Sequence, residues 1–203
     1  MPLTVSYYFT PSSPWTYLGH ERFLRIAAAA GATIIPKPVD YGRIFPASGG
    51  LPLKQRPQQR QAYRMSELKR WREHLKLPLN LEPRHFPVDA NPGALLLVAA
   101  QAHGTAAVMR LAGELLRACW VDERNIADPS ELAAAALAAG LDGKVLLAAS
   151  TSAQTQATYA ALTEEAIQNQ VFGAPTWEVA GELFWGQDRL EFLERALARA
   201  AGA

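Results

Sequence analysis

Residues 3–16 read LTVSYYFTPSSPWT and contain the signal that decides the fold of this chain. The first seven of them are mostly aromatic or β-branched and predict a strand. Ser13 followed by Pro14 is typical of a helix start, with serine at the N-cap and proline at the first helical position. We expect this helix to continue from Trp15 to about Ala29. A strand therefore passes directly into a helix whose first turn carries a hydroxyl group.

A second strand is expected at residues 33–39, with the sequence TIIPKPV, so the chain opens as a β-α-β unit. The helical crossover between the two strands implies that they are parallel. The two prolines favour a place at the edge of a sheet. Residues 42–57 are rich in glycine, proline and serine and predict a loop.

The middle of the chain has helical spacing and no segment that predicts a strand. Helices are expected at residues 58–76, 93–103 and 105–120. Another is started by residues 128–131 and runs to Ala139, and a last one runs from a cap at Ser150 or Thr151 to about Asn169. A proline-rich connection separates the first two of these helices. Lysines and arginines cluster between Lys54 and Arg72, mixed with glutamines and glutamates, and this mixture predicts a solvated helix face.

Strand character returns near the end of the chain. Residues 175–180 and 183–185 predict a hairpin, and a helix is expected from Arg189 to about Ala200. The order β-α-β, helices, β-β-α predicts an α/β protein with a thioredoxin-like fold, interrupted by a large all-helical insertion. On this division residues 1–41 and 170–203 form the thioredoxin-like domain, and residues 42–169 form the helical insertion domain.

Composition limits the possible partners. The 203 residues carry a net charge of +1, with 49% hydrophobic and 19% charged residues, which is typical of a soluble globular protein. No broad field of one sign would attract nucleic acid or an anionic membrane, and no apolar stretch is long enough to span a bilayer. We expect a cytoplasmic protein. The single cysteine, Cys119, lies in an apolar helical run and predicts an inert buried thiol, and no spacing of ligands predicts a metal site.

Three motifs in order carry a resemblance to a known family. They are YF…SPWTYL from Tyr8 to Leu18, FGAPT from Phe172 to Thr176, and FWGQDRL from Phe184 to Leu190. With them the whole chain resembles the 2-hydroxychromene-2-carboxylate isomerases and the kappa-class glutathione transferases, within the DsbA-like branch of the thioredoxin superfamily. Redox members of that superfamily carry two cysteines where this chain has Ser13 and Thr16. Pro175 falls where the family has a cis-proline, the residue for which a cis bond is routine.

The resemblance implies a site for glutathione. Ser13 would be the catalytic residue, because a free thiol with a pKa of about 8.5 is only about 3% thiolate at pH 7 and needs stabilisation. A helix N-terminus and a donated hydroxyl together can lower that pKa by about 1.5–3 units. The cofactor-binding residues implied by the family are Ser13, Ala174, Pro175, Trp185, Gln187 and Asp188.

Each of these residues also has a purely structural interpretation. Ser13 and Asp188 are both suitable helix caps, and Trp185 is suitable for a core. In the family interpretation, Ala174 pairs its backbone with the cysteine part of glutathione. Asp188 pairs with the γ-glutamyl amine, and the first N–H groups of the last helix receive the γ-glutamyl carboxylate.

The second substrate is expected to be a small aromatic molecule between the thioredoxin-like core and the insertion. The candidate pocket residues are Tyr17, Phe45, Trp120 and Phe172, each of which could instead pack between the domains. One departure from the family lies in the loop after the second strand. Phe45 or Pro46 stands where members often have lysine, and Gly50 where they have asparagine. Arg43, Lys54 or backbone groups would have to supply those contacts.

The function implied by the resemblance is a glutathione-dependent isomerase of the 2-hydroxychromene-2-carboxylate isomerase type, acting in aromatic-compound catabolism. In such enzymes the glutathione thiolate is a catalytic nucleophile that is regenerated. Two alternatives stay open: a kappa-like glutathione transferase, and a non-catalytic thioredoxin-fold module that binds a thiol ligand. A homodimer is expected from the resemblance alone.

Overall fold

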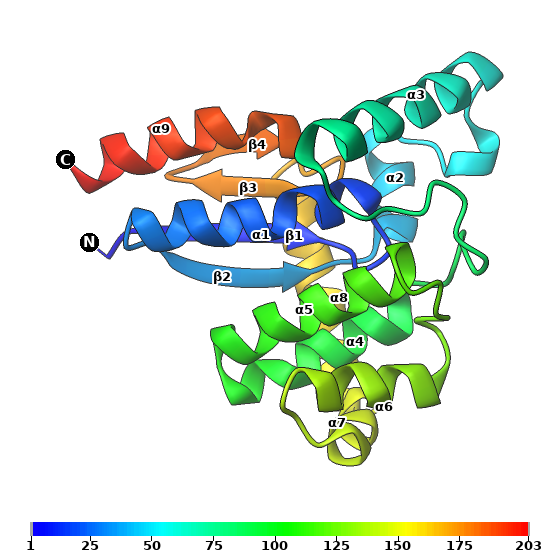
Figure 1. Cartoon of the computed structure of the whole chain (residues 1–203). Coiled ribbons are helices and arrows are strands. Elements are labelled where there is room, and N and C mark those ends of the chain that lie inside the picture. The colour runs from blue at the N-terminus through cyan, green and yellow to red at the C-terminus, as the bar shows by residue number, and fades with distance from the viewer. Residues whose placement is uncertain (1, 203) are drawn as a thin grey trace.

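The computed structural model describes residues 2–202 and places a four-stranded sheet at the centre of the molecule (Figure 1). The strands are β1 (Thr4–Phe9), β2 (Thr33–Pro38), β3 (Thr176–Val179) and β4 (Glu182–Trp185), in the order β2-β1-β3-β4. β1 is parallel to β2 and antiparallel to β3, and β3 and β4 form the expected hairpin. The predicted β-α-β and β-β-α halves are therefore confirmed, and together they form one sheet.

Two helices cover one face of this sheet. They are α1 (Pro14–Ala29) and α9 (Leu190–Ala201), which lie side by side (Figure 1). Beneath them the rings of Tyr7, Phe23 and Trp177 pack with centroids 4.7–5.8 Å apart, and all three side chains are fully buried. Aromatic pairs at these separations add to the stability gained from burial alone.

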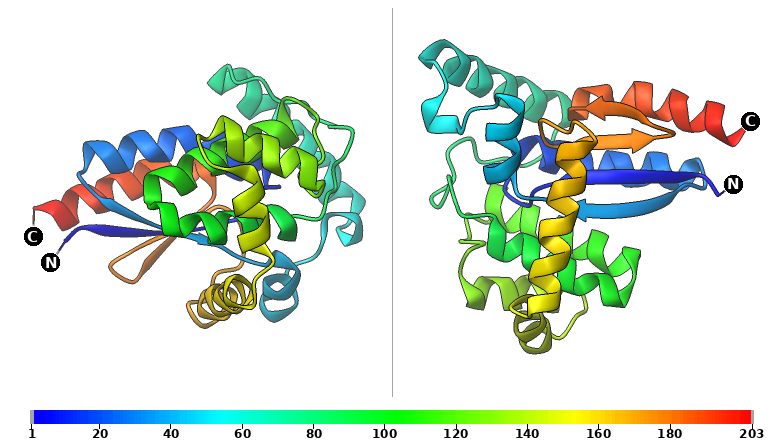
Figure 2. Two further views of the ribbon diagram at one scale, coloured as in Figure 1. Left: turned by 90° about the horizontal axis from the view of Figure 1, so that it is seen from below. Right: turned by 180° about the vertical axis from the view of Figure 1, so that it is seen from behind.

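The opposite face is crossed by α8 (Ala153–Gln168), as the right-hand view of Figure 2 shows. The buried Tyr8 hydroxyl of β1 donates to Glu165 Oε1 at 3.0 Å and accepts from Asn169 Nδ2 at 3.0 Å. Lys37 of β2 forms an ion pair with the same glutamate. This network connects two strands to α8 and satisfies the polar groups that they bury.

The regular elements of the insertion are helices joined by irregular connections. Its elements before α8 are α2 (Tyr41–Ser48), the short 3₁₀ helix η1 (Leu53–Gln55), α3 (Gln58–Leu75), α4 (Asn91–Ala99), the 3₁₀ helix η2 (Ala100–His103), α5 (Thr105–Trp120), α6 (Pro129–Ala138) and α7 (Gly143–Ser150). Buried side chains of α4 and α5 belong to the same hydrophobic core as those of β1, α1 and β3. The insertion therefore packs as part of one body with the sheet.

In the insertion, one segment predicted as a loop starts with a helix, and one helix was not predicted. Residues 42–57, predicted as a loop, begin with the helix α2 despite Pro46 inside it. Asp40 caps this helix by accepting from Gly42 N at 2.7 Å, and Gly49 ends it with a φ of 72°. The helix α7 was not predicted as a separate element, although Asp142 caps it by accepting from two backbone N–H groups.

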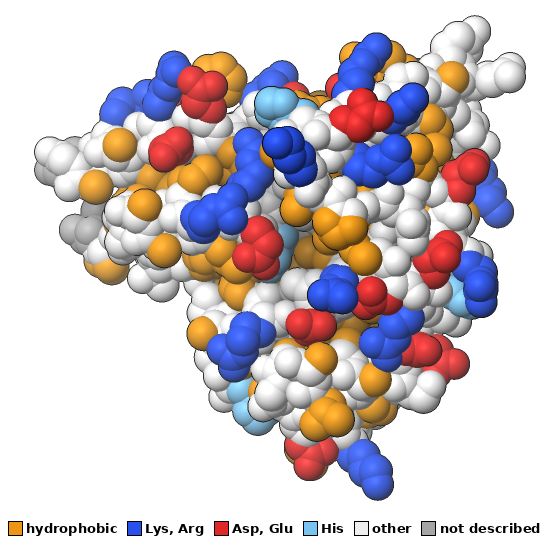
Figure 3. Space-filling view, viewed as in Figure 1, with side chains coloured by type: hydrophobic (Ala, Val, Ile, Leu, Met, Phe, Trp, Pro, Cys, Tyr) orange, Lys and Arg blue, Asp and Glu red, His pale blue; other side chains and the backbone are white. Residues whose placement is uncertain are grey.

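The surface carries charges of both signs, mixed over the face seen in Figure 3. No helix within residues 2–202 is both long enough and apolar enough to cross a membrane. Within the same range no three histidine, cysteine, aspartate or glutamate side chains are grouped as metal ligands.

Candidate functional site

Ser13 stands where β1 gives way to α1. It is buried, with 8% of its surface exposed, and its hydroxyl oxygen accepts from Thr16 N at 3.2 Å, so it is the N-cap of α1. The same hydroxyl donates to the carbonyl oxygen of Ala174 over 3.5 Å, the upper limit of a hydrogen bond. The hydroxyl proton is therefore held only weakly and can turn to a stronger acceptor.

The segment opposite Ser13 is fixed by several backbone contacts. The Ala174–Pro175 peptide bond is cis, as the sequence predicted. The carbonyl oxygen of Gly173 accepts from Tyr41 Oη and from Thr176 Oγ1, both at 2.7 Å. The carbonyl oxygen of Pro175 accepts from Gly186 N at 2.9 Å. These bonds hold the backbone around Ala174 in place and connect it to the turn that opens the last helix.

That last helix begins with a 3₁₀ turn, η3 (Gln187–Arg189), which continues into α9. Asp188 is exposed, and its carboxylate pairs with Arg189 at 2.7 Å. Exposed pairs of this kind are weak, so Asp188 can exchange Arg189 for a ligand amine. The two residues lie beside the backbone that the Pro175–Gly186 bond holds.

Gln187 is placed differently from Asp188. Its side chain is 2% exposed and accepts from Arg22 of α1 at 2.7 Å. A Cβ added at Gly19 would lie 2.9 Å from Gln187 Cβ, so α1 passes very close to it. Gln187 therefore joins α9 to α1 through its side chain, and any contact with a ligand must use its backbone.

Trp185 and Phe172 form an exposed aromatic pair rather than part of the core. They are 51% and 44% exposed, and their ring centroids lie 4.8 Å apart. The indole covers Gly173 so closely that a Cβ there would be 2.1 Å from Trp185 Nε1. Both rings therefore lie next to the Gly173–Pro175 backbone, where they can contact a bound molecule.

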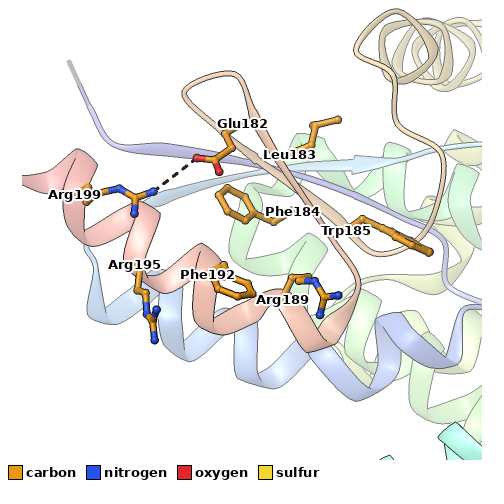
Figure 4. Close-up of a pocket in the computed structure, with 8 residues that line it drawn as sticks. All are labelled: Glu182, Leu183, Phe184, Trp185, Arg189, Phe192, Arg195 and Arg199. Atoms are coloured by element: carbon orange, nitrogen blue, oxygen red, sulfur yellow. Dashed lines mark ion pairs between the residues drawn. The ribbon is translucent and has the colours of Figure 1, made fainter.

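On its other side Trp185 borders a shallow hollow of about 470 Å³ between β4 and α9 (Figure 4). Phe184, Phe192 and three arginines line it. Each arginine pairs with a nearby carboxylate, as Arg199 does with Glu182. The charges of this hollow are thus already compensated.

The other predicted pocket residues are more scattered. Phe45 of α2 is partly buried and packs on Tyr41, with the ring centroids 5.5 Å apart. Tyr17 is partly buried, and its hydroxyl donates to Pro78 O at 2.5 Å. Trp120 is fully buried beneath Phe86, with ring centroids 4.6 Å apart. It therefore supports Phe86 from behind and is not itself available to contact a substrate. Tyr17 borders a separate groove of about 950 Å³ between α1 and α5, whose lining does not include Ser13.

The loop contacts suggested to replace the family lysine and asparagine are also now placed. Arg43 is exposed and pairs with Glu164 of α8 at 3.2 Å. Lys54 is exposed on η1. Arg56 is partly buried, with Cζ 5.8 Å from the ring centroid of Phe45, and donates from Nε to Leu51 O at 2.8 Å.

The prediction that the basic residues from Lys54 to Arg72 form a solvated face was wrong for Arg64. Arg64 is largely covered, with Cζ 5.4 Å from the ring centroid of Phe86 and 6.0 Å from that of Trp120. Burial and the charge of Arg56 lower the pKa of Arg64 to about 10. No local signal in the sequence separates Arg64 from Arg60 and Arg70, which are exposed on the same helix.

Two further titratable groups are not available for chemistry at this site. Cys119 is 3% exposed in α5, and burial raises the pKa of its thiol to about 12. His20 is buried, and burial lowers its pKa; its ring nitrogens lie 3.3 Å from Tyr7 Oη and 3.1 Å from Met109 O. No cysteine of the chain is therefore placed for disulfide exchange at the start of α1.

Comparisons with known proteins show the family to which the chain belongs. The model of the DsbA-like thioredoxin domain matches residues 4–198. A 2-hydroxychromene-2-carboxylate isomerase of Sphingobium xenophagum is 32% identical over 97% of this chain and 99% of its own. One of Pseudomonas putida is 28% identical over 97% of this chain and 95% of its own. A solved structure of a 2-hydroxychromene-2-carboxylate isomerase superposes with a TM-score of 0.79 at 25% identity, covering 98% of this chain and 96% of that one.

The matches span nearly the full length of both partners, so they include the sheet, the insertion and the Ser13 site together. The chain belongs to the DsbA-like thioredoxin-domain family and, within it, to the family of the 2-hydroxychromene-2-carboxylate isomerases.

Proposed function

We propose that this protein is a glutathione-dependent isomerase of the 2-hydroxychromene-2-carboxylate isomerase type. The observation that carries the proposal is the Ser13 hydroxyl, which lies at the N-terminus of α1, 3.5 Å from the carbonyl oxygen of Ala174. A serine here replaces the cysteine on which disulfide exchange depends, so the thiol must come from a ligand. The isomerase relatives give the reaction class.

The donors around Ser13 fit a thiolate. The first N–H groups of a helix have no partners inside the helix, and the helix dipole favours an anion there. The hydroxyl has only a long hydrogen bond to give up, and its oxygen stays bound to Thr16 N. Ser13 would therefore donate to the sulfur anion and hold it without reacting itself.

The remaining groups of glutathione match residues beside Ser13. The backbone of Ala174 is held in a fixed position and can pair with the cysteine part of the tripeptide, as a neighbouring strand would. Asp188 can exchange its exposed pairing with Arg189 for the γ-glutamyl amine. The backbone N–H groups that open η3 suit the γ-glutamyl carboxylate, and Trp185 can cover the tripeptide.

When bound, glutathione would supply a thiol that adds to a conjugated double bond and leaves again, so that the bond geometry changes without net consumption. The protein holds this thiol as the anion through Ser13 and the start of α1. Phe172, which is exposed beside the Gly173–Pro175 backbone, and Phe45, which packs on Tyr41, would contact the planar substrate. A dimer and a cytoplasmic location stay predictions.

The test is isomerisation of 2-hydroxychromene-2-carboxylate by the purified protein with glutathione or with S-methylglutathione, whose thiol is blocked. We expect isomerisation that depends on glutathione, leaves its concentration unchanged and fails with the blocked analogue. A stable glutathione conjugate in the mass spectrum would instead indicate a transferase. Tight glutathione binding without turnover of the substrate would indicate a non-catalytic binding module.

A further inference from the structure

Arg64 lies in an environment that is unusual for an arginine. It is largely removed from water, and none of the ion pairs within residues 2–202 includes it. Its one side-chain hydrogen bond is a long contact, 3.6 Å from Nη1 to Met65 Sδ. The nearest acidic residue along α3, Glu67, is already paired with Arg70. Most of the five donors of the guanidinium therefore have no acceptor among residues 2–202.

A second cation is attached to the same helix. The backbone oxygen of Arg56 accepts from Gln61 Nε2 of α3 at 2.7 Å, three positions before Arg64. The charge of Arg56 contributes to the lowered pKa of Arg64. Arg56 is itself partly buried and forms no ion pair within the described chain. Both cations are partly buried and have no carboxylate partner among residues 2–202, so their free N–H donors are left to water or to an anion from solution. This arrangement is more typical of a binding site than of a surface.

The surroundings of the pair are aromatic. The guanidinium of Arg64 faces the rings of Phe86 and Trp120, and that of Arg56 faces Phe45, at 5.4–6.0 Å from the ring centroids. Stacking on the rings fixes the planes of the guanidinium groups and leaves their N–H edges for a ligand. A planar guanidinium edge matches a carboxylate, which it can bind through two parallel hydrogen bonds.

Arg64 is on a helix that contacts the helix capped by Ser13. α3 packs against α1, and it crosses near the end of α1 that Ser13 starts (Figure 1). The connection after α3 continues the link, because Pro78 O accepts from Tyr17 of α1 and Asn80 N donates to Trp120 O at 2.8 Å. The aromatic residues behind Arg64 are thus attached to the first turns of α1.

We propose that Arg64, with Arg56 beside it, binds the carboxylate of a planar aromatic acid and so orients that acid toward the thiol held by Ser13. This inference rests on the proposed function, because the acid is taken to be the substrate of that reaction. Arg64 would be a specificity-determining residue, since it distinguishes an acid from its neutral analogues.

The experiment compares two stable probes, chromone-2-carboxylate and chromone-2-carboxamide, which share a bicyclic ring and differ in charge. Calorimetry with the full chain should show that the acid binds more tightly than the amide. We expect Arg64→Gln to weaken binding of the acid by about 10- to 100-fold, the effect of losing a charged hydrogen-bonded pair, with little change for the amide. Lys69→Gln removes one positive charge from an exposed position of α3 and should change the affinity for neither the acid nor the amide.

Two more variants keep the test independent of folding. Arg64→Lys retains the charge but loses the planar fork, so it should keep part of the preference for the acid. Arg56→Gln should weaken binding of the acid by a smaller factor than Arg64→Gln does. Thermal melting of every variant identifies any that has unfolded. If Arg64→Gln is unfolded, the affinity of Arg64→Lys for the acid and the amide tests the proposal instead.

Unchanged acid affinity in a folded Arg64→Gln variant would overturn the proposal. So would weaker glutathione binding with unchanged acid binding, because the arginines would then hold a carboxylate of glutathione. The proposed function is judged separately, by turnover of the parent protein. If the acid binds through Arg64 but the parent protein isomerises no substrate, the proposed carboxylate site stands and the proposed reaction is refuted.

Discussion

The Ser13 hydroxyl donates to the carbonyl oxygen of Ala174 across 3.5 Å, between residues 161 positions apart in the chain. This contact joins the start of α1 to the segment before Pro175, the two parts of the fold that the proposed thiol chemistry uses. Its length is informative, because a hydroxyl with a short bond would have to break it before it could bind a thiolate. Ser13 needs only a small rotation of its hydroxyl proton.

Replacing Ser13 with alanine should slow glutathione-dependent isomerisation by about 10- to 100-fold, because a hydroxyl bound to an anion contributes about 1.5–3 kcal/mol. The pKa of the bound thiol should rise by about 1–2 units at about 1.36 kcal/mol each. Titration of the ultraviolet absorbance of the thiolate measures this change directly.

Ser13→Ala also removes a helix cap, which by itself costs about 1 kcal/mol of stability. Asp142→Ala is the matched control, because Asp142 caps α7 in the insertion in the same way. It should lower the melting temperature while leaving the rate and the thiol pKa unchanged. If both variants slow the reaction equally, Ser13 acts only as a cap.

Asp188→Asn should weaken glutathione binding by about tenfold, because a carboxylate paired with the γ-glutamyl amine is replaced by a neutral amide. Calorimetry of glutathione measures the affinity. Glu191→Gln is the control, since Glu191 is an exposed acid of α9 paired with Arg195. An equal loss of affinity in the two variants would mean that glutathione binding depends on the overall charge at the start of α9 and not on Asp188 itself.

Tyr41→Phe should lower stability by about 1 kcal/mol, because it removes the 2.7 Å hydrogen bond to Gly173 O. Thr176 still donates to that carbonyl, so the fold should persist. Glutathione affinity should fall a few-fold as the backbone before Pro175 loosens. Tyr159→Phe loses a bond of 2.9 Å to Asn91 within the insertion and should leave glutathione affinity intact. An unchanged affinity in Tyr41→Phe would show that Thr176 alone holds the segment.

Cys119 should affect stability at high pH. Its folded pKa, about 12, lies above the ordinary value of 9.0, so the folded protein keeps a proton that the unfolded chain loses. The stability associated with this thiol is complete below pH 9 and is lost as the pH rises from 9 toward 12. At pH 10 the loss is about 1.4 kcal/mol, from about 1.36 kcal/mol per unit. Chemical denaturation at pH 8 and pH 10 should show a smaller decline for Cys119→Ala than for the parent, and an equal decline would contradict the burial argument.

Much of the fold followed from local patterns in the sequence. The Ser13-Pro14 pair located the start of α1, and the alternation of short strands with helical segments located all four strands of the sheet. These signals are local because capping and backbone preferences depend on neighbours in the chain. The same reasoning failed for α2, where the capping by Asp40 outweighed a composition rich in glycine and proline.

The positions of the site residues relative to one another depended on tertiary structure. Ser13, Ala174 and Asp188 were predicted from motifs, but the bond between Ser13 and Ala174 exists only because β3 pairs with β1. Gln187 belonged to the same motif as Asp188, yet its side chain faces Arg22 and not the ligand side.

The sequence by itself determined the elements and the serine at the start of α1, because each depends on adjacent residues, whereas the cis-proline was implied by the resemblance to the family. It could not distinguish Arg64 from the solvated arginines of the same helix, nor show that Phe86 covers Trp120. Both facts depend on where the connection after α3 lies against α5. Burial of a charge is a property of segments brought together from distant parts of the chain, so only the tertiary structure decides it.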